Sequence, residues 1–98
     1  MASMATCEQI AAALASKLGT SIKTKSAGED KKEGMAYCSG TLNNNLNYSV
    51  LDINEGKRCN VEISSSSVTA TINVPSSYSN TYIANRAGNA YNGANSNS

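Results

Sequence analysis

Residues 34–74, GMAYCSGTLNNNLNYSVLDINEGKRCNVEISSSSVTATINV, decide the fold of this chain. Apolar and polar residues alternate here in four runs, and turn-forming residues separate the runs. Alternation with a period of two is typical of strands that bury one face, and short polar loops join such strands antiparallel. The stretch therefore predicts a four-stranded antiparallel meander. Its inward positions are Ala36, Cys38, Gly40, Leu42, Leu46, Tyr48, Val50, Cys59, Val61, Ile63, Val68, Ala70, Ile72 and Val74.

The loops 43–45, 54–57 and 64–67 provide a test of strand register. Closing each hairpin around its loop predicts these cross-strand pairs: Cys38 with Val50, Tyr48 with Ile63, and Val61 with Ala70. Both members of every pair are already assigned to the same face, and a one-residue slip would destroy that agreement. The same register places Gly40 opposite Tyr48, whose ring can cover the bare backbone.

A helix is predicted before the sheet. Thr6 and Gln9 have the spacing of a capping box, which predicts that the helix begins at Thr6. Apolar residues then recur at helical spacing and form one stripe, which consists of Cys7, Ile10, Ala11, Leu14 and Leu18. Gly19 follows the stripe and is the residue type that ends a helix most easily. The helix should pack its stripe on the inward face of the sheet.

The rest of the chain carries weaker signals. A short strand is expected at 20–25, followed by a polar loop through Glu33. After Pro75, the spacing of Tyr82, Ile83, Ala87, Ala90 and Tyr91 leaves a short second helix open, with Gly88 as an interruption. Residues 1–4 resemble an expression-vector remnant, residues 5–91 form one expected domain, and the Asn- and Ser-rich residues 92–98 are expected to be disordered. The predicted class is α+β, with an N-terminal helix on one face of a four- to five-stranded antiparallel sheet.

One corner of the outward face of the sheet is unexpectedly apolar. Met35 falls opposite Ile53, and Tyr37 falls opposite Leu51, whereas the outward residues of the later strands are polar. Two interpretations remain open. Either the C-terminal segment folds back and covers these four side chains with Tyr82, Ile83 and Tyr91, or they form a surface for a protein partner or for self-association.

The three cysteines, Cys7, Cys38 and Cys59, all belong to predicted inward positions. Because a strand separates Cys38 from Cys59, their backbones should lie roughly 10 Å apart, too far for a disulfide. A disulfide from Cys7 to either Cys38 or Cys59 is geometrically easier. Three reduced thiols that pack as small apolar side chains are an equally good interpretation.

Several kinds of function are disfavoured. The chain has no histidine, so Ser–His and Cys–His catalysis is excluded, and no P-loop or dinucleotide-binding fingerprint is present. The cysteine spacings match no zinc motif, and neither a metal nor a cofactor is expected. A net charge of +1 does not indicate a nucleic-acid partner, and no apolar stretch is long enough to span a membrane. An enzyme is therefore the least expected class.

The expected function is a non-enzymatic binding or structural module whose partner is a protein, either another protein or a second copy in a homo-oligomer. Charged residues make up only 15% of the chain, against about 25% in average soluble domains, which favours a location outside the cytoplasm. One alternative is an intracellular protein of the phage or mobile-element kind that binds and modulates a host protein. Another is a carrier of a small molecule or lipid, with a cavity between helix and sheet near Ala11, Ala36, Gly40 and Ala70.

Overall fold

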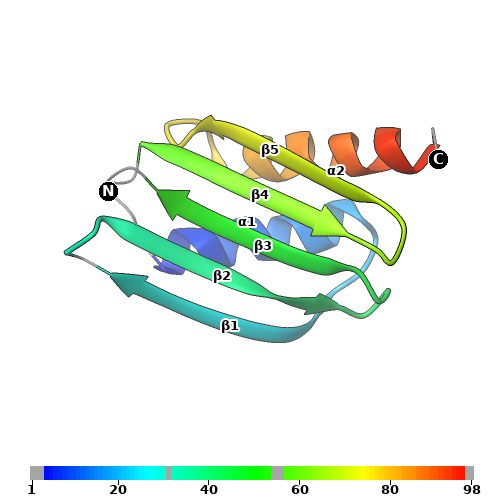
Figure 1. Cartoon of the computed structure of the whole chain (residues 1–98), viewed down its shortest axis with the longest axis horizontal. Coiled ribbons are helices and arrows are strands. Elements are labelled where there is room, and N and C mark those ends of the chain that lie inside the picture. Colours follow the sequence, from blue (N-terminus) through cyan, green and yellow to red (C-terminus); the bar gives the residue numbers. More distant parts are fainter. Residues whose placement is uncertain (1–3, 31, 54–56, 97–98) are drawn as a thin grey trace.

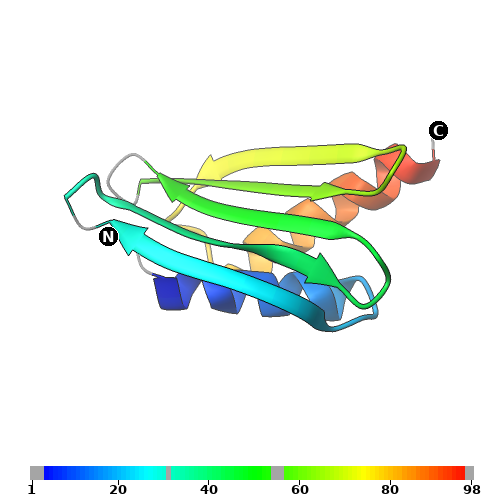
Figure 2. The same ribbon diagram turned by 60° about the horizontal axis from the view of Figure 1, so that its bottom comes forward.

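The computed structural model describes residues 4–30, 32–53 and 57–96 and has an α+β architecture. Its elements are α1 (Met4–Lys17), β1 (Ile22–Asp30), β2 (Met35–Leu42), β3 (Asn47–Ile53), β4 (Arg58–Ser64), β5 (Thr69–Pro75) and α2 (Asn80–Ser96). The five strands form one antiparallel sheet in the order β1-β2-β3-β4-β5, and both helices lie on the same face of it (Figures 1 and 2). The predicted meander with a helix on one face is confirmed.

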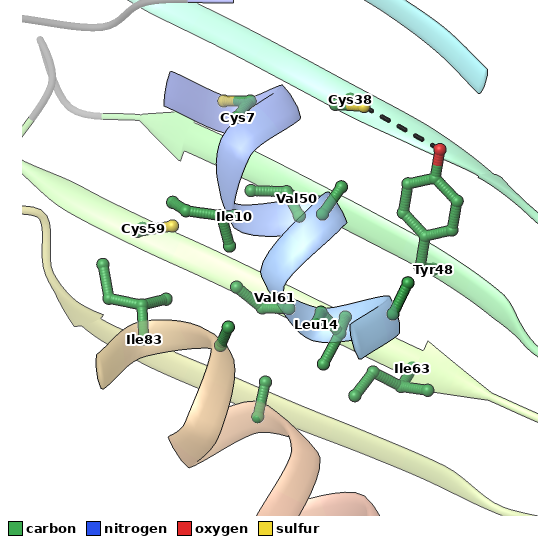
Figure 3. Packing of buried hydrophobic residues seen from close by; sticks show 14 of the residues in the cluster. Cys7, Ile10, Leu14, Cys38, Tyr48, Val50, Cys59, Val61, Ile63 and Ile83 are labelled. Carbon is green, nitrogen blue, oxygen red and sulfur yellow. Dashed lines mark hydrogen bonds between the residues drawn. The ribbon is translucent and has the colours of Figure 1, made fainter. Parts of the chain in front are cut away.

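The apolar stripe of α1 faces the sheet as predicted. Figure 3 shows Cys7, Ile10 and Leu14 pointing from α1 toward the side chains of the central strands, and all three are fully buried. The helix ends in a Schellman motif, in which Gly19 has a φ of 71° and the Thr20 N–H donates to the Ala15 carbonyl at 2.9 Å. The predicted start at Thr6 is wrong, since α1 includes Met4 and Ala5, two residues that favour a helix.

The first strand is longer than its sequence suggests. A polar loop was predicted to follow residue 25, but β1 continues to Asp30 and pairs with β2 along its length. The backbone of residues 26–30 is hydrogen-bonded by β2, so the segment needs no apolar alternation of its own. The turn that follows is held by Asp30, whose Oδ1 accepts hydrogen bonds from the N–H groups of Lys32 and Glu33.

Two of the three predicted registers are confirmed. Cys38 pairs with Val50, and Tyr48 pairs with Ile63. The predicted pairing of Val61 with Ala70 is wrong, because Val61 pairs with Ile72. The turn lies at Ser66 and Ser67 instead of across 64–67: the Ser65 N–H donates to the Val68 carbonyl at 2.8 Å, and Ser65 Oγ accepts from the Val68 N–H.

Gly40 and Tyr48 form a close contact between three strands. A Cβ on Gly40 would overlap the Thr24 carbonyl oxygen and come within 2.7 Å of its carbon, so only glycine fits beside the irregular pairing of β1 near Thr24. The Tyr48 ring lies opposite Gly40, and its hydroxyl donates to the Thr24 carbonyl at 3.0 Å. The predicted pairing of Gly40 with Tyr48 is confirmed, but the atoms nearest to a Cβ on Gly40 belong to the β1 backbone and not to the Tyr48 ring.

The second helix is confirmed and is longer than predicted. Ser79 caps it, accepting a hydrogen bond at its Oγ from the Tyr82 N–H at 3.1 Å. Gly88 does not interrupt the helix; it lies where α2 meets α1, and a Cβ there would come 2.6 Å from Lys17 Cγ. The expected disordered tail began at Asn92, but the helix continues through Ser96, because Tyr91 and Ala94 pack against the core.

Candidate functional site

The outward face of the sheet is the open surface of this fold. Both helices cover the opposite face, where α1 packs on β1–β3 and α2 packs on β4 and β5 (Figure 2). The alternative in which the C-terminal segment covers the outward apolar side chains is therefore wrong. Ile83 and Tyr91 are buried in the core beneath the sheet, and Tyr82 is exposed on α2.

Four apolar side chains gather at one end of this face, and we call them the β2–β3 corner: Met35, Tyr37, Leu51 and Ile53. Tyr37 pairs directly with Leu51, as predicted, while Met35 begins β2 and Ile53 ends β3. Met35 is 37% exposed and Tyr37 is 41% exposed, whereas Leu51 and Ile53 are half-buried. The structure thus brings all four predicted residues together.

The ring of Tyr37 leans away from Leu51 toward the edge of the sheet. A Cβ on Gly28, its partner on β1, would lie 2.9 Å from Tyr37 Cε1 and 3.2 Å from its hydroxyl oxygen. The ring therefore lies over the bare backbone of Gly28, an arrangement in which an aromatic residue shields a glycine from water. It leaves a hollow between Tyr37, Met35 and Leu51.

That hollow is a shallow, open recess of about 340 Å³. Its lining is mostly apolar, and Glu29 and Asp30 of β1 also border it. Of these two, Asp30 has its side chain on the outward face, because it pairs with Met35. Glu29 instead pairs with the inward residue Ala36. The lining residues are Gly28, Glu29, Asp30, Met35, Ala36, Tyr37 and Leu51. An apolar lining with a carboxylate beside it suits a bulky apolar side chain next to a basic one.

The remainder of the outward face is polar and carries few charges. Most outward positions of β2–β5 beyond the corner are hydroxyl or amide residues, and the two charged ones are Arg58 and Glu62. Arg58 Nε donates to Asn73 Oδ1 at 2.8 Å, and its Nη2 donates to the Asn73 carbonyl at 3.0 Å. The β2–β3 corner is therefore an apolar patch with a polar surround.

The three cysteines occupy the interior as free, fully buried thiols, as Figure 3 shows for Cys7 on α1 and for Cys38 and Cys59 on the sheet. The strand order confirms that β3 separates Cys38 from Cys59. A disulfide between Cys7 and Cys38 or Cys59 stays a prediction, which alkylation of the unreduced, unfolded protein followed by peptide mapping tests.

A buried carboxylate lies among these thiols. Asp52 is 3% exposed, pairs with Cys59 across β3 and β4, and accepts a hydrogen bond from Ser76 Oγ at 3.1 Å. Alternation along β3 places Asp52 on the inward face, but sequence analysis did not single it out. The signal that could have found it is its parity with Tyr48 and Val50.

The surroundings of the thiols suppress their reactivity. Burial raises the pKa of Cys7 to about 12 and that of Cys59 to about 11, and in both cases the charge of Asp52 is the second cause. Burial also raises the pKa of Cys38. Since the thiolate is the nucleophile, these groups are poorly suited to covalent catalysis at neutral pH.

No group of three or more His, Cys, Asp or Glu side chains within residues 4–30, 32–53 and 57–96 has an arrangement that could hold a metal ion. Among the described residues, neither helix is long and apolar enough to cross a membrane.

Comparisons with protein-family models, with curated proteins and with solved structures return no match.

Proposed function

We propose that this chain is a non-enzymatic protein-binding module that acts outside the cytoplasm through the β2–β3 corner. The observation that supports the proposal is the exposure of Met35 and Tyr37 on a sheet face that neither helix covers. Contiguous exposed apolar side chains with a polar surround are typical of contact surfaces, and Tyr and Met are enriched in them.

The recess defines the chemistry of the partner. Its apolar lining accepts one bulky apolar side chain, and the carboxylate of Asp30 beside it favours a lysine or arginine next to that side chain. We expect a partner segment that carries these two residue types side by side. The low content of charged residues supports the location outside the cytoplasm.

The carrier alternative receives less support. It required room between helix and sheet near Ala11, Ala36, Gly40 and Ala70. At Gly40, the backbone of Thr24 occupies the space that a side chain would take, and Ala11 and Ala36 are buried against their neighbours. The small inward residues thus allow close packing of the backbone at this point.

A displayed library of random peptides tests the proposal. Peptides selected on the wild-type chain should carry a large apolar residue beside a basic one, and they should lose binding to Tyr37→Ser and to Leu51→Ser. Asn47→Ser is the matched control, since Asn47 lies on β3 four residues from Leu51, at the polar end of the same face. Circular dichroism verifies that all three variants fold.

Selected peptides that bind Tyr37→Ser and Leu51→Ser as well as they bind the wild type would overturn the assignment of the corner. Peptides that lack a basic residue but still need Tyr37 would overturn the role of Asp30 alone.

A further inference from the structure

The two edge strands of the sheet, β1 and β5, differ in how well they are protected against pairing with another chain. At one edge, β1 carries four charged residues (Lys23, Lys25, Glu29 and Asp30) and an irregular pairing near Thr24. Charges and bulges are the devices that stop an edge strand from pairing with another chain. At the other edge, β5 has the sequence TATINVP, without a charged residue, and its only proline is the last residue. Of the two edges, only β5 lacks this protection.

The hydrogen bonds at the two ends of β5 identify which of its backbone groups face outward. The Ser65 N–H donates to the Val68 carbonyl, and the Ser76 N–H donates to the Lys57 carbonyl. Hydrogen-bonded pairs alternate along an antiparallel ladder, so the even-numbered residues of β5 bond to β4. The N–H and C=O groups of Thr69, Thr71 and Asn73 therefore point away from the sheet.

Little else in the described chain occupies this edge. Arg58 reaches the Asn73 carbonyl at 3.0 Å, and no hydrogen bond from another loop or helix among the described residues reaches Thr69 or Thr71. The inward side chains at the edge, Ala70 and Ile72, are half-buried and pack against the core from one side. A further strand would cover them from the other side.

The helix that packs under β5, α2, carries small residues on the flank that faces away from α1. Gly88 of α2 faces α1 through Lys17, and Ala90, two residues on, is turned by about 200° around the helix axis. Ala90 and Gly93 therefore lie on the flank of α2 that points away from α1, and a Cβ on Gly93 would meet nothing within 4 Å. In Figure 1 the C-terminal end of α2 extends past β5, and Ala90 and Gly93 belong to this end of the helix.

We infer that β5 pairs antiparallel with β5 of a second copy of this chain, about a two-fold axis beside Thr71. This register makes Thr71 its own partner and pairs Thr69 with Asn73, which gives about six backbone hydrogen bonds. Ala70 and Ile72 then lie opposite one another on the inward face. The two α2 helices run antiparallel beneath the joint, where Ala90 and Gly93 allow close approach.

A second copy fits this edge better than an unrelated strand does. The register that is symmetric about Thr71 keeps inward side chains facing inward in both copies, and an uncharged edge meets itself without repulsion. Because the β1 edges are protected, the assembly closes as a dimer with a ten-stranded sheet. The axis is perpendicular to the sheet, so both β2–β3 corners open on the same side, roughly 30 Å apart at the usual strand spacing.

Opposite charges placed at the axis test the pairing. Glu62 lies opposite Thr71 on β4, so both variants, Thr71→Lys and Thr71→Glu, are made in a Glu62→Gln background. Sedimentation measures the dimer fraction from micromolar to millimolar concentration. The background protein should dimerise, and each charged variant should dimerise at least about fivefold more weakly, because like charges then face each other across the axis.

Mixing the two variants should restore the dimer. With one variant labelled with ¹⁵N, native mass spectrometry should find the mixed dimer in excess over both homodimers. The same two charges at Ser26, an exposed outward residue of β1, should leave dimerisation unchanged.

Three results would overturn the inference. The wild-type chain could remain monomeric up to millimolar concentration, the charged variants could dimerise as well as the background protein, or the mixture could show no preference for mixed dimers. A dimer that is lost in Tyr37→Ser but kept in Thr71→Lys would assign self-association to the β2–β3 corner and overturn the β5 pairing alone. If no peptide binds the β2–β3 corner while the β5 dimer still forms, the proposed function is overturned and the β5 pairing stands.

Discussion

Replacing Gly88 by alanine tests how closely α2 packs on α1. The added Cβ would lie 2.6 Å from Lys17 Cγ, whereas carbon atoms in good contact are about 3.5–4.0 Å apart. Lys17 Cγ is near the backbone end of its side chain and cannot move far without shifting α1. We therefore expect an overpacking cost of about 1–3 kcal/mol. Alanine favours the helix by about 1 kcal/mol, so Gly88→Ala should lower the free energy of unfolding by about 1 kcal/mol.

Gly93 provides the matched control within the same helix. Within a single chain its Cβ would meet nothing within 4 Å. At protein concentrations where the chain is monomeric, Gly93→Ala should therefore show the helix preference alone and raise the free energy of unfolding by up to about 1 kcal/mol. Urea unfolding followed by circular dichroism measures both variants, and an unchanged m-value verifies that each comparison concerns stability. The two substitutions are chemically identical, so the difference between them, about 2 kcal/mol, reports the helix contact.

A double-mutant cycle with Lys17→Ala identifies the contact that causes the cost. Without Lys17 Cγ, Gly88→Ala should become stabilising, and the coupling between the two positions should be about 1–3 kcal/mol. If Gly88→Ala stabilises the wild-type chain as much as Gly93→Ala does, or if the cycle shows no coupling, then α2 does not lie against Lys17 at Gly88 and the packing described above is wrong.

Three further substitutions test the core. Gly40→Ala should cost about 3 kcal/mol or prevent folding, because its Cβ would overlap the Thr24 backbone, as urea unfolding will measure. Ser76→Ala should cost about 1–3 kcal/mol, because buried Asp52 loses its hydrogen-bond donor. The free energy of unfolding should fall as the pH rises from 9 toward 12: the unfolded thiol of Cys7 ionises near 9.0 and the folded thiol only near 12, which costs about 1.4 kcal/mol per pH unit. In Cys7→Ala this slope should be shallower.

Each of these has a control or a contrary outcome. Gly28→Ala meets only the movable ring of Tyr37, so it should cost less than Gly40→Ala; equal costs would contradict the close approach of β1 to Gly40. Ser77→Ala, at an exposed neighbouring position, should leave stability unchanged. An identical alkaline slope in the wild-type chain and in Cys7→Ala would show that Cys7 is accessible to solvent.

The β2–β3 corner was predictable from sequence, since it depends only on local information. Side chains alternate strictly along a strand, and the loop 43–45 fixes how β2 meets β3, with Asn45 in the left-handed conformation at a φ of 68°. The pairing of Tyr37 with Leu51 is enough to predict that both side chains lie on the outward face. The sequence does not predict whether another part of the chain covers that face, because the apolar spacing in α2 suits either face of the sheet.

The pairing of β4 with β5 shows where alternation stops being informative. The predicted register placed Val61 opposite Ala70, and the structure places it opposite Ile72, two residues away. A slip of two residues leaves every side chain on its own face, so the hydrophobic pattern is the same in both registers. The side chain of Ser65 selects one of them through its hydrogen bond to the Val68 N–H, which is specific to the folded turn.

The sequence by itself determined the class of fold, the inward face of four strands and the identity of the β2–β3 corner, because period and loop length act over a few residues. Only the tertiary structure decided that β1 extends to Asp30, that α2 joins α1 under the sheet and that the outward face stays open. These features depend on contacts between segments far apart in the chain: the backbone of β1 is satisfied by β2, and Gly88 takes its role from Lys17. The burial of Asp52 among the thiols depends in the same way on Ser76, which lies 24 residues further along the chain.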